Sequence, residues 1–188
     1  MDSDPEFENN EEEMEVERKP IPEVLHSFYE ERPFKICTRC GESLADFEDG
    51  FRVSKHFKAG ETIIEYALCF PCLHQMIEES SEESKERLME FQMSRFRNVS
   101  GFDECNLCEK TQETARDHEF GLVGICQGSD MLDSGMVCVD CIEEMSELVS
   151  EETRGGWDRF KEENFPGIPA DFAPGPVPGP VKKTPVMI

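Results

Sequence analysis

Alternating hydrophobic and polar residues, followed by hydrophobic residues at helical spacing, organise the middle of the chain. Two alternating runs cover residues 51–57 and 62–68, and the short polar segment 58–60 separates them, which is typical of a β-hairpin. From residue 70 to about residue 96, hydrophobic residues recur three and four positions apart among good helix formers. The pattern predicts a hairpin followed by one long helix.

This arrangement occurs twice. The segment Cys69–Met76 aligns with Cys138–Met145, and the match continues downstream, where Ser81 aligns with Ser150. The second copy is less regular, because Gly155–Gly156 should interrupt its helix and four further glycines should break its hairpin. These four are Gly121, Gly124, Gly128 and Gly135. The sequence therefore predicts two copies of one unit, the second of them distorted.

The two ends of the chain differ in composition from the middle. Residues 1–33 begin with nine carboxylates between Asp2 and Glu17, so we expect an acidic, largely disordered segment. Within it, Ile21–Tyr29 has a spacing that fits one amphipathic turn packed on the first unit. Residues 164–188 contain seven prolines and three glycines, which favour a disordered, extended tail.

Size and composition fit two small modules better than one large core. The chain has 188 residues, of which 37% are hydrophobic. We place the modules at residues 34–99 and 100–163. Modules of roughly 60 residues bury little apolar surface, so they usually need disulfides, metal or a partner for stability. The expected fold class is small α+β, metal-stabilised, with two tandem zinc-finger modules and disordered termini.

Eight of the nine cysteines form four CxxC pairs. The segments between the two pairs of each unit are 28 and 29 residues long. Zinc favours four soft ligands in a tetrahedron, and a two-residue gap lets both sulfurs of a pair reach one ion. We expect two Zn²⁺ per chain, although iron fits the same tetrahedron and a reduced-thiol or disulfide interpretation stays open. The expected ligands are Cys37, Cys40, Cys69 and Cys72 in the first site, and Cys105, Cys108, Cys138 and Cys141 in the second.

Two pairings of these cysteine pairs are possible. A cross-brace would join the first pair to the third and the second to the fourth. The internal repeat argues against it, because a unit that was copied whole should contain a whole site.

A cysteine knuckle, a hairpin, and a helix whose first turn supplies the last two ligands resemble the treble-clef class of zinc fingers, with a general likeness to zinc ribbons. The resemblance covers about residues 34–96 and, less cleanly, 102–161. It implies structural zinc. Thiolates in a first helical turn are also physically reasonable, because the free N–H groups and the positive end of the helix dipole stabilise them.

Other candidate residues have simpler interpretations. Cys126 alternates with Leu122 and Gly124, which predicts a buried strand position. His74 follows a CxxC pair, but four cysteines already complete that site, so we expect a surface histidine. Two basic groups should balance nearby carboxylates; they are Arg52, Lys55, His56 and Lys58, and Lys85, Arg87, Arg95 and Arg97.

The sequence favours a non-catalytic role. It has no catalytic zinc motif of the H-x-E or H-E-x-x-H type beside a cysteine pair, no phosphate-binding loop and no nucleophile elbow. The absence of a secretory signal or an apolar membrane span predicts a cytoplasmic protein. A net charge of −23 disfavours direct binding to nucleic acid or anionic lipid.

The hypothesis is therefore a zinc-binding adaptor or regulator with a protein partner, of unspecified oligomeric state. The alternatives are a redox-responsive thiol and zinc switch, a nucleic-acid-associated zinc-finger protein, and a zinc-dependent enzyme, which would need a site open to solvent.

Overall fold

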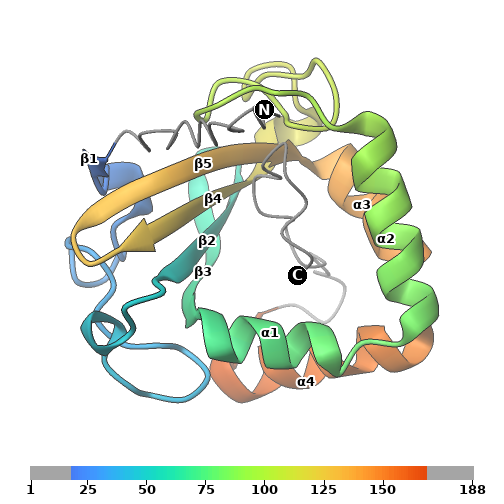
Figure 1. The fold of residues 1–188 in the computed structure, drawn as a ribbon. Helices are drawn as coiled ribbons and strands as arrows, with labels where there is room; N and C mark the ends of the chain where they lie inside the picture. Colours follow the sequence, from blue (N-terminus) through green and yellow to red (C-terminus); the bar gives the residue numbers. More distant parts are fainter. Residues whose placement is uncertain (1–17, 169–188) are drawn as a thin grey trace, which may run out of the picture.

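The computed structural model describes residues 18–168, and its centre is one antiparallel sheet of five strands in the order β1-β5-β4-β2-β3 (Figure 1). The strands are β1 Lys19–Pro20, β2 Phe51–Lys58, β3 Glu61–Cys69, β4 Glu119–Gln127 and β5 Asp130–Cys138. The terminal segments 1–17 and 169–188, which the sequence predicts to be disordered, lie outside the described residues. Within the described part of the chain, no helix is both long and apolar enough to cross a membrane.

Both hairpins are complete. The first is confirmed as predicted, with Ala59 and Gly60 in the turn at φ 50° and 84°. The prediction that glycines break the second hairpin is wrong, because β4 and β5 are both nine residues long and pair along their length. Gly124 allows a close approach instead, since a Cβ there would overlap the side chain of Leu25. Gly135 does the same against Asn106.

The two hairpins join into one sheet through β2 and β4, which the sequence did not predict. Ser54 pairs with Val123, and Lys55 pairs with Leu122. Leu122 and Val123 lie 68 positions after Ser54 and Lys55, the same offset that separates Cys105 from Cys37. Each residue therefore pairs with the copy of its neighbour, as at a twofold axis between identical subunits. The two units form one pseudo-symmetric body with a shared sheet.

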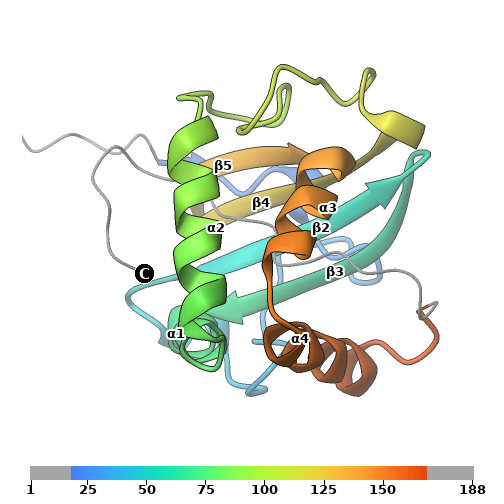
Figure 2. The same cartoon turned by 90° about the vertical axis from the view of Figure 1, so that its right-hand side faces the viewer.

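Four helices lie on one side of this sheet (Figures 1 and 2). They are α1 Phe70–Glu78, α2 Glu82–Arg95, α3 Val139–Leu148 and α4 Glu151–Asn164. The sequence predicted one helix over residues 70–96 and a break at Gly155–Gly156, and both predictions are wrong. The breaks fall before Glu82 and before Glu151, and α4 runs through both glycines.

Serine N-caps explain where the helices break. The Ser81 hydroxyl accepts a hydrogen bond from the amide of Ser84, and the Ser150 hydroxyl accepts one from the amide of Thr153. The two caps also meet each other: the amide of Ser81 donates to Thr153 Oγ1 (3.0 Å), and the amide of Ser150 donates to Ser84 Oγ (2.9 Å). The two caps thus exchange equivalent hydrogen bonds, as expected for two units related by a pseudo-twofold axis.

The opposite side of the sheet is covered by the segment that precedes the first knuckle. Its short 3-10 helix, η1 Glu23–Leu25, buries Leu25 completely against Gly124. Lys55 donates to the carbonyl of His26 (2.6 Å). The amphipathic turn is thus present. The expectation of disorder up to residue 33 is wrong for residues 18–33, because this segment packs on the core.

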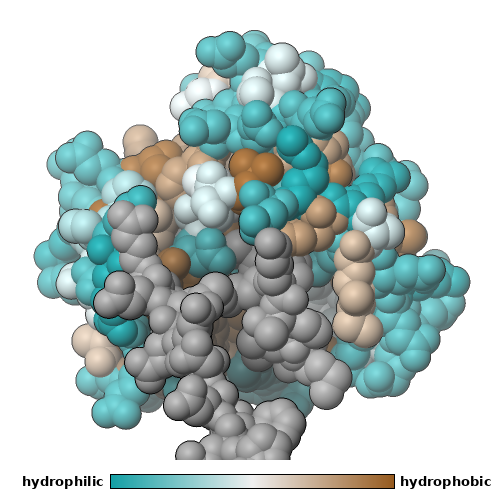
Figure 3. Space-filling view, turned by 45° about the horizontal axis from the view of Figure 1, so that its top comes forward, coloured by the Kyte–Doolittle hydropathy of each residue, from teal (hydrophilic) through white to brown (hydrophobic). Residues whose placement is uncertain are grey.

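The face drawn in Figure 3 is mostly hydrophilic, and its hydrophobic side chains form small, separate patches. This agrees with 42 acidic and 19 basic residues in the chain.

Candidate metal centres

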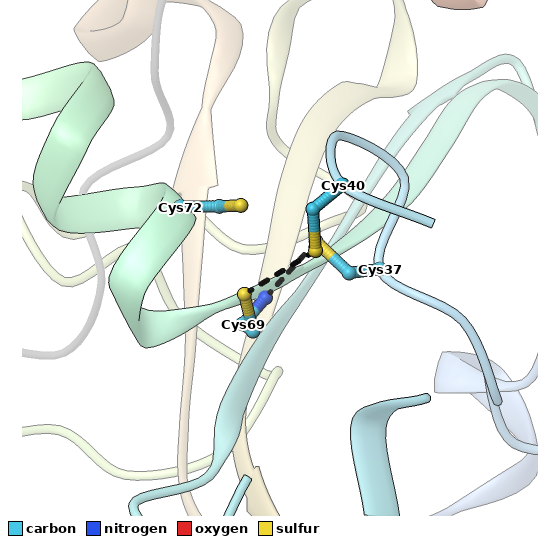
Figure 4. A group of neighbouring side chains, drawn as sticks. All are labelled: Cys37, Cys40, Cys69 and Cys72. Atoms are coloured by element: carbon cyan, nitrogen blue, oxygen red, sulfur yellow. Dashed lines mark hydrogen bonds between the residues drawn. The ribbon is translucent and has the colours of Figure 1, made fainter. Parts of the chain in front are cut away.

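The first group of cysteines lies where the knuckle meets the end of β3 and the start of α1 (Figure 4). Cys37 and Cys40 lie in the loop before the short 3-10 helix η2 (Leu44–Asp46), Cys69 ends β3, and Cys72 is in the first turn of α1. Their four sulfur atoms lie within 4.8 Å of one another. Cys40 is exposed, and the other three are buried.

The second group repeats this arrangement. Cys105 and Cys108 lie in the loop before β4, Cys138 ends β5, and Cys141 is in the first turn of α3. Their sulfur atoms also lie within 4.8 Å of one another. The structure therefore brings together all eight predicted cysteines in the sequential pairing, and it excludes the cross-brace.

Both knuckles close with the same backbone hydrogen bond. The amide of Cys37 donates to the carbonyl of Glu42 (2.8 Å), and the amide of Cys105 donates to that of Lys110 (2.8 Å). Gly41 has φ 74°, a left-handed conformation that favours glycine at this turn. The second knuckle has Glu109 at this position, yet it keeps the closing bond.

Each site also contains a hydrogen bond from backbone to sulfur. The amide of Cys69 donates to the sulfur of Cys37 (3.4 Å), and the amide of Cys138 donates to the sulfur of Cys105 (3.4 Å). Such bonds stabilise a thiolate. The same bond at matched positions in both units shows that the two sites are built alike.

In the first site, these contacts separate the acidities of the thiols. Burial raises the pKa of Cys37, but backbone hydrogen bonds from Cys40, Cys69 and Arg39 outweigh it and lower this pKa to about 7. The pKa values of Cys69 and Cys72 are raised, chiefly by burial. One sulfur is thus readily a thiolate, while its neighbours need a cation to lose their protons.

In the second site, hydrogen bonds from Cys138 and Cys141 lower the pKa of Cys105, and its backbone donors add to the effect. The same contacts raise the pKa of Cys141 and raise that of Cys138 to about 12. In both sites, the pKa of the first knuckle cysteine is lowered, and the pKa values of the two cysteines at the strand end and the helix start are raised.

The donor set fits a tetrahedral metal ion. The sulfur atoms of Cys40 and Cys69 are 3.9 Å apart, and those of Cys108 and Cys138 are 3.5 Å apart. A tetrahedron with Zn–S bonds of about 2.3 Å has edges of about 3.8 Å. A disulfide would need a separation of about 2.05 Å, and all nine cysteines are free.

Two arginines donate hydrogen bonds to backbone carbonyl groups of the cysteines, a role that the sequence did not predict. Arg39 donates to the carbonyl of Cys72 (3.3 Å) and so ties the knuckle to α1. Arg97 donates to the carbonyls of Cys105 (3.3 Å) and Cys108 (2.6 Å). Arg39 lies inside the first CxxC pair, which is a visible signal, whereas the sequence indicated Arg97 only as one member of a basic group.

The other candidates lie outside the two sites. Cys126 is buried in β4 as predicted, and burial raises its pKa to about 12. His74 is exposed, and its ring stacks on Phe70.

The basic residues of the first hairpin do not form a surface patch. Arg52, Lys55 and His56 are buried. Lys55 pairs with Glu65, and His56 pairs with Glu119. The second basic group, on and after α2, is engaged as well. Its four residues Lys85, Arg87, Arg95 and Arg97 pair with Glu82, Glu83, Glu144 and Glu104.

The fold and these two sites define a small α+β protein with two four-cysteine sites that suit metal binding. The chain matches no protein-family model, no curated protein and no solved structure. The chemistry of the sites therefore carries the functional argument.

Proposed function

We propose that this chain is a non-catalytic zinc-binding protein in which two structural Zn²⁺ ions fix two treble-clef-like units, and that it acts as an adaptor or regulator for another protein. The observation that carries the zinc proposal is the repeated group of four sulfurs, with the same amide-to-sulfur bond in each. Four thiolates complete the coordination of zinc, so no position stays open for substrate or water.

The position of the sites favours a structural role for the metal. Each group connects a loop to the junction of a strand and a helix. A Zn²⁺ ion would hold loop, sheet and helix together and would stabilise the buried sulfurs as thiolates. In small domains, such coordination supplies a large part of the folding free energy.

The outer face of α2 supports the adaptor role. Met89 and Met93 lie one helical turn apart and are 54% and 66% exposed. Methionine adapts its shape and is favoured on surfaces that bind helices or peptides. Glu86 and Glu90 lie beside them, and the net charge is −23, so the fitting partner is a basic protein with an apolar anchor.

One observation favours the redox alternative. Cys40 is the exposed member of the first site, so an oxidant would reach its sulfur before the buried ones. A redox switch would then release zinc from the first site before the second, which a colorimetric zinc chelator would detect during peroxide titration. An adaptor with purely structural sites would lose zinc from both only on unfolding.

Photo-crosslinking tests the adaptor role directly. A photoreactive amino acid at position 89 or 93 of the zinc-loaded chain, expressed in its native cell, should capture a discrete protein. The same group at exposed Glu162 on α4 is the matched control. Capture at 89 and 93, but not at 162, and its loss after M89E/M93E would support the proposal; equal capture at all three positions would refute the surface.

A further inference from the structure

A cleft with a volume of about 340 Å³ lies between α1 and α4, two helices that lie side by side (Figures 1 and 2). Met76 lines it from α1, and Trp157 and Phe160 line it from α4. The two aromatic rings form an edge-to-face pair with centroids 5.6 Å apart. Cavities of about 300–1,000 Å³ with apolar walls and a few polar groups are typical of sites for small organic molecules. The cleft therefore has the size and the walls of a small-ligand site.

The pseudo-symmetric counterpart of this helix pair is packed more closely. α1 corresponds to α3 and α4 corresponds to α2, and α2 and α3 approach each other more closely than α1 and α4 do. The Arg95 guanidinium of α2 and the Glu144 carboxylate of α3 form an ion pair across that interface (2.7 Å). The duplication of the unit therefore does not account for the cleft, which is a property of the α1–α4 interface alone.

Gly156 forms part of the cleft wall in the middle of α4. Glycine inside a helix is less stable than alanine, so this position needs a physical reason. Tight packing is not that reason, because a Cβ at Gly156 would meet only Arg159, whose Nη2 would be 3.9 Å away. The aligned position in α2 is Arg87, a good helix former. Space for a ligand against the backbone of α4 agrees with a glycine at this position.

The cleft carries one uncompensated charge of each sign. Arg39 and Glu79, which also line it, form an ion pair with each other (2.7 Å). Arg159 and Glu163 lie one helical turn apart on α4, and both are exposed. Within residues 18–168, however, neither of them forms an ion pair. One free guanidinium and one free carboxylate at the same cleft suit a ligand that itself carries one negative and one positive group.

We infer that this cleft binds a free α-amino acid with a large apolar side chain. The ligand carboxylate binds the guanidinium of Arg159, whose planar fork matches a carboxylate. The ligand ammonium binds the carboxylate of Glu163, and the apolar side chain packs against Met76 and Trp157. A phosphate ester fits less well, because a doubly charged anion would be repelled by Glu163. The site uses no cysteine, so it does not depend on the adaptor role.

Trp157 is the one tryptophan of the chain, so its fluorescence reports on the cleft directly. Titration of the full-length, zinc-loaded chain with L-phenylalanine should give a saturable change with a dissociation constant on the order of 1 mM, as expected for a ligand of this size. Phenylpropionate lacks the ammonium and phenethylamine lacks the carboxylate. Each should bind about tenfold more weakly, because one charged partner of the cleft is left without its counterpart.

Matched variants of α4 separate the cleft from its surroundings. R159Q and E163Q should each weaken the binding of L-phenylalanine by about tenfold, whereas E162Q, at an exposed carboxylate outside the cleft, should leave it unchanged. G156A should also weaken binding, because its methyl group enters the cleft, whereas G155A should not. Both alanine variants should keep or raise the thermal midpoint, because alanine favours the helix. Weaker binding by G156A would therefore not be a result of unfolding.

Three results would overturn the inference. The first is the absence of a saturable change in the unaltered chain up to about 10 mM L-phenylalanine. The second is equally tight binding of phenylpropionate or phenethylamine, and the third is unchanged binding by R159Q and E163Q. Zinc content should stay at two per chain in every variant, because none of them alters a cysteine. Failure of the ligand site is thus distinguishable from failure of the metal proposal.

Discussion

Replacing Glu65 with glutamine should release the segment that covers the outer side of the sheet. The Glu65 carboxylate lies 2.9 Å from the ammonium of Lys55, and the two side chains are 8% and 5% exposed. Both carboxylate oxygens also accept the amide of Phe28 (2.8 and 3.0 Å), and one accepts the hydroxyl of Ser27. A single side chain thus links β2, β3 and the segment before the first knuckle.

The expected loss in the free energy of unfolding can be worked out from the burial of the Lys55–Glu65 pair. The E65Q change removes the carboxylate charge beside the Lys55 ammonium, which keeps its hydrogen bond to the carbonyl of His26 and its contact with the ring of Phe57. Breaking one partner of a buried pair costs about 3–5 kcal/mol. If the segment then detaches, Leu25 loses its fully buried position, which adds about 2 kcal/mol. The free energy of unfolding should therefore fall by about 3–7 kcal/mol.

Urea unfolding of the zinc-loaded protein, followed by the fluorescence of its one tryptophan, measures this loss. E83Q is the matched control, because Glu83 forms an exposed ion pair with Arg87 and its removal should cost less than about 1 kcal/mol. The double variant K55M/E65L should recover most of the stability, since no buried charge remains. A loss below about 1 kcal/mol in E65Q would refute the reasoning.

Three further perturbations test other parts of the structure. G124A should lower stability by about 1–3 kcal/mol, because its Cβ would overlap Leu25; an unchanged thermal midpoint would contradict the packing. S150A should cost about 1 kcal/mol in urea unfolding, because it removes the N-cap of α4 and the hydroxyl that accepts a hydrogen bond from Ser84 Oγ; no loss would count against the paired caps. Burial lowers the pKa of His56 from 6.5, although Glu119 lies beside it. As the pH falls, the imidazole is therefore protonated in the unfolded chain before it is protonated in the folded chain. The contribution of His56 to stability should be complete above pH 6.5 and should decrease as the pH falls below that value. H56Q should flatten that dependence between pH 6.5 and 5 relative to the unaltered chain, and identical slopes would show that His56 does not contribute.

The sequence predicted the local parts of this structure well. Alternation and the polar turn at residues 58–60 predicted the first hairpin, because both signals come from neighbours in the chain. The CxxC spacing and the repeat predicted which cysteines lie together, since a copied unit keeps its own contacts. Cys126 was also placed correctly, in a buried strand.

Failures occurred where long-range contacts decide the structure. Gly124 and Gly135 resemble breaks in a strand, but each makes room for a side chain from a distant segment. The helix break at Ser81 depends on a cap that pairs with the cap of α4, 69 residues away. The pairing of β2 with β4 has no local signal either, so two separate hairpins could not be distinguished from one shared sheet.

Metal content is the most direct test of the central claim. Protein purified without added metal should contain two zinc ions per chain by inductively coupled plasma mass spectrometry, and its far-UV circular dichroism should collapse when a chelator removes them. A chain that carries well under one zinc ion and keeps its folded spectrum would contradict the account, because the two groups of cysteines would then not be structural metal sites.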